Sequence, residues 1–119
     1  MPSDRDIAQQ LTDRLVHSLG ASRVVWFGSR ATGTPRPDSD WDLLVVADLT
    51  GSPAMRAYRA EQATADVAVP KDFVVVTPAE YARLRGWRSS VVHAAEAGGA
   101  VLYADPETVA AARAWAGIG

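Results

Sequence analysis

Two aspartates separated by one residue, Asp40 and Asp42, open an apolar run that continues through residues 43–46. On a β-strand alternate side chains share a face and two residues span about 6.5 Å, so both carboxylates would project the same way. This separation suits a pair of divalent metal ions about 3.5–4 Å apart. Gly28 and Ser29 end the preceding apolar run, and small residues with free amides allow a phosphate to approach closely. Together these residues predict magnesium-dependent chemistry on a nucleotide.

Each of these features has a simpler explanation when it is taken alone. A Gly-Ser pair is common in an ordinary strand-to-helix turn, and aspartates near a turn are commonly exposed to solvent. Two carboxylates on one face also repel each other, so a cation or a hydrogen-bond donor has to compensate them. Their occurrence together, between two strand-like runs, favours a functional site.

Two short sequence elements resemble those of a known superfamily. Residues 28–33 read Gly-Ser-Arg-Ala-Thr-Gly, and residues 39–42 read Ser-Asp-Trp-Asp. They resemble the signature of the polymerase-β-type nucleotidyltransferases, most closely the minimal nucleotidyltransferases, which include the antitoxins of HEPN/MNT toxin–antitoxin pairs. The resemblance covers residues 24–46 directly, and Thr32 departs from it because many relatives carry arginine there. It implies a polymerase-β-like α/β (α+β) fold, with a small mixed β-sheet flanked by helices.

The resemblance also implies a set of metal ligands. Asp40 and Asp42 would hold two Mg2+ ions, with Mn2+ as an alternative metal, and a third carboxylate would come from the next strand of the sheet. Asp72 fits that place because an apolar, strand-like run follows it directly. Asp66 is the rival, in a segment that could itself be the strand. We prefer Asp72 because the run after it is longer and purely apolar.

The chemistry implied by the resemblance is transfer of a nucleoside monophosphate. A hydroxyl oxygen would attack the α-phosphorus of a nucleoside triphosphate in line, and pyrophosphate would leave. The three carboxylates would be both catalytic residues and metal ligands, and Asp72 would be placed to accept the proton of the hydroxyl. Gly28, Ser29 and Arg30 would bind the nucleotide, with the Ser29 hydroxyl and nearby backbone amides on its phosphates.

The bulk properties bound the possible function classes. The chain has 119 residues, 48% of them hydrophobic and 22% charged, which is typical of one globular domain over residues 1–119. A net charge of −2 gives no general attraction to nucleic acid or to an anionic membrane. The absence of cysteine excludes disulfide scaffolds and thiolate metal sites. We expect a cytoplasmic protein, because no apolar run is long enough to span a bilayer and no signal-peptide core is present.

Helices and strands alternate along the chain. Ser3 is the expected N-cap of a first helix, and Gly20 is its stop. Its apolar stripe, at a spacing of four, is formed by Ile7, Leu11, Leu15 and Leu19. We expect strands at 23–27, 41–46, 73–76 and 100–103, and further helices from 53 to about 65, from 77 to the interruption at 86, from about 89 to 98, and from 105 to about 117. This order predicts a mixed α/β domain.

At 119 residues we expect no second domain that would hold the acceptor. We therefore expect the acceptor site to come from a partner chain or from a second copy. The resemblance implies AMP transfer from ATP, or from another nucleoside triphosphate, to a hydroxyl of a HEPN-type toxin, with tyrosine as the expected acceptor. Two alternatives stay open: a non-catalytic antitoxin that acts by occlusion, and a nucleotidyltransferase for a small-molecule hydroxyl that works as a homodimer. Neither membrane contact nor strong nucleic-acid binding is expected.

Overall fold

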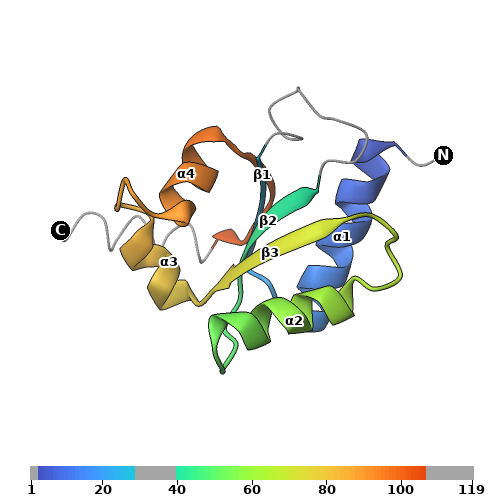
Figure 1. The fold of residues 1–119 in the computed structure, drawn as a ribbon, viewed down its shortest axis with the longest axis horizontal. Helices are drawn as coiled ribbons and strands as arrows, with labels where there is room; N and C mark the ends of the chain where they lie inside the picture. Colours follow the sequence, from blue (N-terminus) through green and yellow to red (C-terminus); the bar gives the residue numbers. More distant parts are fainter. Residues whose placement is uncertain (1–2, 29–39, 107–119) are drawn as a thin grey trace.

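The computed structural model describes residues 3–28 and 40–106. Its elements follow the predicted alternation (Figure 1). They are α1 (Asp4–Leu19), β1 (Arg23–Phe27), β2 (Trp41–Val46), α2 (Pro53–Ala63), β3 (Lys71–Val76), α3 (Pro78–Leu84), α4 (Val91–Gly98) and β4 (Ala100–Ala104). The part of the predicted terminal helix that follows Pro106 lies outside the described residues. Ser29 and Arg30 also lie outside them. No helix in the described part is long and apolar enough to cross a membrane.

The four strands form one mixed sheet in the order β3-β2-β1-β4. β1 pairs antiparallel with both β2 and β4, whereas β2 and β3 run parallel. α2 lies in the connection between the parallel pair, because parallel neighbours cannot be joined by a tight turn. The predicted α+β class, a small mixed sheet flanked by helices, is confirmed.

Helices cover both faces of this sheet (Figure 1). The core between the sheet and α1 and α2 contains Leu43 and Val45 of β2, whereas Leu44 and Val46 lie in the core beneath α3 and α4. Side chains alternate between the two faces of a strand, so a central strand covered on both faces needs apolar residues at consecutive positions. This explains why these four residues form an uninterrupted apolar run and are all 0% exposed.

α1 begins and ends where the sequence predicts. The Ser3 hydroxyl accepts a hydrogen bond from the Asp6 amide at 3.2 Å, and the Asp6 carboxylate accepts one from the Ser3 amide at 3.2 Å, which completes a capping box. Gly20 ends the helix with φ 65°, a left-handed conformation that glycine adopts without strain. Leu11 and Leu15 are fully buried and fix the helix on the sheet.

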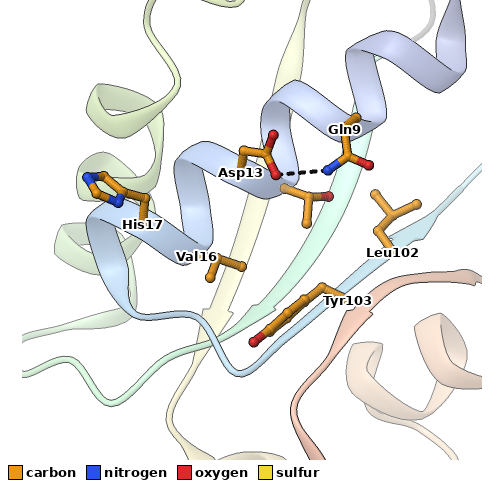
Figure 2. Close-up of a pocket in the computed structure, with 7 residues that line it drawn as sticks. Gln9, Asp13, Val16, His17, Leu102 and Tyr103 are labelled. Atoms are coloured by element: carbon orange, nitrogen blue, oxygen red, sulfur yellow. Dashed lines mark hydrogen bonds between the residues drawn. The ribbon is translucent and has the colours of Figure 1, made fainter.

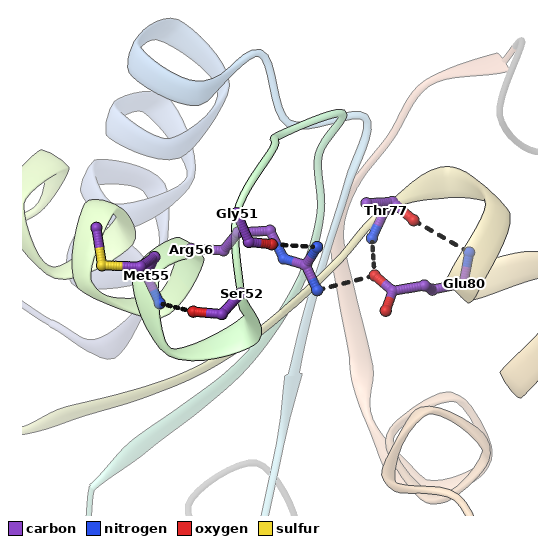
Figure 3. Close-up of polar contacts among 6 residues, drawn as sticks. All are labelled: Gly51, Ser52, Met55, Arg56, Thr77 and Glu80. Carbon is purple, nitrogen blue, oxygen red and sulfur yellow. Dashed lines mark hydrogen bonds and ion pairs between the residues drawn. The ribbon is translucent and has the colours of Figure 1, made fainter.

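A buried arginine joins the two helical layers beyond the carboxyl ends of β2 and β3 (Figure 3). Arg56 of α2 donates to the Gly51 carbonyl at 3.2 Å and to Glu80 Oε1 of α3 at 2.9 Å. Glu80 also accepts a hydrogen bond from the Thr77 amide at 2.9 Å. This amide and, after it, the charge of Arg56 hold the pKa of Glu80 below its usual value, against the opposing effect of burial. This contact therefore connects α2 and α3 at the end of the sheet that lies opposite to the candidate carboxylates.

Candidate active site

Asp42 and Asp72 lie side by side at the amino ends of two neighbouring parallel strands. The register of β2 and β3 pairs Asp42 with Asp72, and neighbouring strands lie about 4.8 Å apart. Both positions share the face of Leu44 and Val74, which is the face covered by α3 and α4. Asp40 directly precedes β2 and is exposed. The structure therefore brings the three predicted carboxylates to one corner of the sheet, which we call the acidic corner.

The electrostatics of Asp42 show that the three groups interact. Asp42 is partly buried, and the lost solvation raises the pKa of its carboxyl above the usual value. The negative charge of Asp72, followed by that of Asp40, raises this pKa further. A cation placed among these groups would relieve both effects, because it favours the ionised carboxylates. The acidic corner is therefore suited to binding positive charge.

Trp41, between the two aspartates in sequence, points to the opposite face of the sheet. It is 1% exposed and stacks on Trp26 of β1, with ring centroids 4.1 Å apart and an interplanar angle of 10°. Because neighbouring residues of a strand face opposite sides, burial of Trp41 directs Asp42 toward α3 and α4. The spacing of the aspartates does not reveal this positioning role. Its signal in the sequence is a large aromatic residue between two acidic ones.

Gly28 makes room for the Asp42 carboxylate. Its φ of 84° lies in the left-handed region, and a Cβ built there would overlap Asp42 Oδ2 and lie 3.1 Å from Asp42 Cγ. Phe27, the residue before it, pairs with Asp42 across β1 and β2. The sequence predicts a nucleotide-binding role for Gly28, and the structure adds a close approach to a carboxylate that local spacing does not reveal.

The oxygen atoms of the acidic corner are of the kind that Mg2+ prefers. Asp40, Asp42 and Asp72 supply this donor chemistry, and their mutual repulsion favours a bound cation. Within residues 3–28 and 40–106, however, no three His, Cys, Asp or Glu side chains are arranged to hold one metal ion. Mg2+ keeps several waters and commonly takes phosphate oxygens as ligands. A metal ion at this corner would therefore need further ligands, which the phosphates of a nucleotide could supply.

Asp66, the rival for the third carboxylate, lies in the turn that follows α2. Its Oδ2 accepts hydrogen bonds from Arg14 Nη2 at 2.8 Å and from Arg14 Nε at 3.0 Å. These bonds hold the pKa of Asp66 below its usual value. β3 begins at Lys71, so the alternative strand at residues 65–69 is wrong. Of the two aspartates, Asp72 is the one that lies on the strand beside Asp42.

The match to a protein-family model spans the acidic corner. A model described as a nucleotidyltransferase domain matches residues 8–92, which is more than half of the chain. The chain belongs to this family. The three candidate carboxylates and Gly28 all fall within the matched residues of this nucleotidyltransferase domain. A search of curated proteins finds no match to the chain.

Solved structures share the fold of this nucleotidyltransferase domain. A structure of a toxin–antitoxin with AMP-PNP matches with TM-score 0.59 and 16% identity, over 93% of this chain and 85% of that one. A mutant of the toxin–antitoxin MntA-HpeT with two aspartate-to-glutamate substitutions matches with TM-score 0.57 and 15% identity, over 93% of this chain and 85% of that one. A tyrosine-to-alanine mutant of MntA-HpeT matches with TM-score 0.51 and 18% identity, over 98% of this chain and 81% of that one. At these identities the likeness shows a shared fold, and the predicted polymerase-β-like fold class is confirmed. The family model, not these structures, shows that the chain is a nucleotidyltransferase domain.

Asparagine substitutions should separate the roles of Asp72 and Asp66. Asp72→Asn should strongly slow nucleotidyl transfer and spare nucleotide binding, because Asp40 and Asp42 remain in the acidic corner. Asp66→Asn should change transfer little, since its carboxylate is engaged by Arg14 in an exposed ion pair, and such pairs contribute little to stability. Transfer rates measured beside nucleotide titrations would compare the two variants. Loss of transfer in Asp66→Asn with a normal rate in Asp72→Asn would contradict the assignment.

Proposed function

We propose that this nucleotidyltransferase domain moves a nucleoside monophosphate, AMP from ATP, to a hydroxyl group on a partner protein. The observation that carries the proposal is the pairing of Asp42 with Asp72 on adjacent parallel strands, with the pKa of Asp42 raised by the charges of Asp72 and Asp40. Two Mg2+ ions, or Mn2+, would be held by these three carboxylates and would neutralise the charge of the triphosphate when bound.

The residues of the acidic corner divide the remaining work. The oxygen of the acceptor hydroxyl forms a bond to the α-phosphorus, and Asp72 receives the proton that this hydroxyl loses. The bond between the α-phosphorus and the bridging oxygen breaks, and pyrophosphate leaves with that electron pair. Gly28, which has no side chain, leaves room for the Asp42 carboxylate. Ser29 and Arg30, which follow Gly28 directly, would bind the phosphates of the nucleotide.

The proposed acceptor is a hydroxyl of a HEPN-type toxin. Support comes from the matched structures, which are toxin–antitoxin structures, one of them with AMP-PNP. Another carries aspartate-to-glutamate substitutions at two aspartates two residues apart, the spacing of Asp40 and Asp42. A partner that holds its hydroxyl in line supplies orientation, which can lower the barrier by about 7–11 kcal/mol in favourable cases. The isolated chain should therefore turn over ATP slowly.

Intact mass spectrometry tests this function directly. Co-expression with a HEPN-type protein from a neighbouring gene should add one or more AMP units to that protein. The purified pair with ATP should show the same gain in Mg2+ and none after EDTA treatment, because the triphosphate then lacks its counter-ions. Protection of cells from the toxin without any mass gain would favour occlusion instead. Fast transfer to a free aminoglycoside without a partner would favour the small-molecule alternative.

A further inference from the structure

A groove runs between α1 and β4, away from the acidic corner. One hollow of about 530 Å³ lies between Gln9, Asp13 and His17 of α1 and Tyr103 of β4 (Figure 2). A second hollow, of about 180 Å³, adjoins it and includes Arg5 among the residues that line it. Gln9, Thr12 and Leu102 line both hollows, so they mark the middle of one groove. Between residues 5 and 17 a helix rises about 18 Å, which gives the length of the groove.

Among the described residues, β4 forms an uncovered edge of the sheet on one side of this groove. It is the last strand in the order β3-β2-β1-β4, and in the described residues it pairs with β1 alone. Its five residues read Ala-Val-Leu-Tyr-Ala, with neither charge nor proline, and Val101 is 51% exposed. Soluble proteins usually block an edge strand with charged residues, proline or a covering element. An apolar edge of this kind is a template for another strand.

The floor of the groove contains a polar atom without a partner. Thr12 is 6% exposed, and its Oγ1 has no hydrogen-bond partner among the described residues. Buried hydroxyls in proteins are nearly always hydrogen-bonded. Because this atom is covered by protein, it makes the floor of the groove polar but is not itself a contact for an occupant.

We propose that the occupant is a second copy of this chain, bound through antiparallel pairing of β4 with β4. A two-fold axis requires a self-complementary surface. We place the two-fold axis beside Gln9 and Leu102, in the middle of the groove. Arg5 of each copy then lies opposite Asp13 of the other copy, which gives two equivalent pairs of opposite charge. Both side chains are exposed, and in the described part Asp13 accepts a hydrogen bond from Gln9 at 2.8 Å.

Sedimentation of the purified chain over a range of concentrations tests this interface. The wild type should form dimers that dissociate on dilution, and Val101→Lys should be monomeric throughout, because a lysine ammonium blocks the paired edge. Met55→Lys is the matched control, since Met55 is 56% exposed on α2 and should leave the dimer unchanged. A monomeric wild type, or a dimer that survives in Val101→Lys, would overturn the proposal.

A charge swap tests the orientation of the two copies. Arg5→Asp and Asp13→Arg should each weaken the dimer, because each sets like charges opposite one another. The double variant should regain it, since the pair is then restored in the reverse sense. Far-ultraviolet circular dichroism at a dilution where all variants are monomeric would verify that each is folded. Weakening in the double variant equal to or greater than in the single variants would show that these residues do not face each other.

Discussion

Asp42→Asn should abolish nucleotidyl transfer and leave the fold intact. Asp42 stands between the other two carboxylates, opposite Asp72 on the neighbouring strand and two residues from Asp40. Asparagine keeps the shape of the side chain but removes the negative charge that the proposed metal sites need. We expect a rate loss on the order of 10³-fold or more, comparable with removal of a single group that stabilises a transition state. Quantified transfer of labelled AMP to the partner protein would measure it.

The stability of Asp42→Asn provides an independent readout. The pKa of Asp42 is raised in the folded state, so the ionised form costs stability at neutral pH. Asp42→Asn should therefore melt at a higher temperature than the wild type at neutral pH, and the difference should shrink as the pH falls through the folded-state pKa of Asp42, because the wild-type carboxyl then becomes protonated. Asp48→Asn, at an exposed aspartate beyond the carboxyl end of β2, is the matched control and should retain transfer. Unfolding of Asp42→Asn would show instead that the carboxylate is structural.

Alternation along strands made much of the acidic corner predictable. Asp42 and Leu44 share one face and Trp41 and Leu43 share the other, so an apolar run that starts after Asp42 places its carboxylate at the end of a buried strand. The turn and cap residues Ser3 and Gly20 likewise mark the limits of α1. These features depend on residues close in sequence, which is why sequence patterns detect them.

The boundaries around the connection from α2 to β3 were less predictable. α2 ends at Ala63, earlier than expected. The Thr64 hydroxyl donates to the Glu61 carbonyl at 3.3 Å and so competes for the acceptor that the next residue would use in a longer helix, and the Ala65 amide donates to the Gln62 carbonyl instead. β3 begins at Lys71 rather than residue 73, and the Lys71 ammonium donates to the carbonyls of Thr64 and Val67 at 3.0 and 2.8 Å. A strand predicted from its apolar residues alone misses Lys71 and Asp72, because their polar side chains are not part of the core. The Arg14–Asp66 pair joins residues far apart in sequence, so no local pattern could exclude Asp66.

Gly28→Ala should lose most nucleotidyl transfer, and a second glycine allows the cause to be isolated. Gly28 and Gly20 both have positive φ, 84° and 65°, so alanine at either position pays about 1–2 kcal/mol of left-handed backbone strain. A Cβ at Gly20 meets nothing within 4 Å, whereas a Cβ at Gly28 overlaps Asp42 Oδ2. Only at Gly28 does the added methyl group also displace a carboxylate of the acidic corner.

The two alanine variants should therefore have similar melting temperatures and very different activities. Gly20→Ala should be destabilised by backbone strain alone and transfer AMP normally at a temperature where it is folded. Gly28→Ala should be destabilised by a similar amount, because the Asp42 side chain can rotate away from the methyl group, and that rotation removes the carboxylate from its place beside Asp72. Thermal melts and transfer rates at one temperature would test both statements. Normal transfer in Gly28→Ala would show that the position of the Asp42 carboxylate does not matter, and the proposed active site would then be wrong.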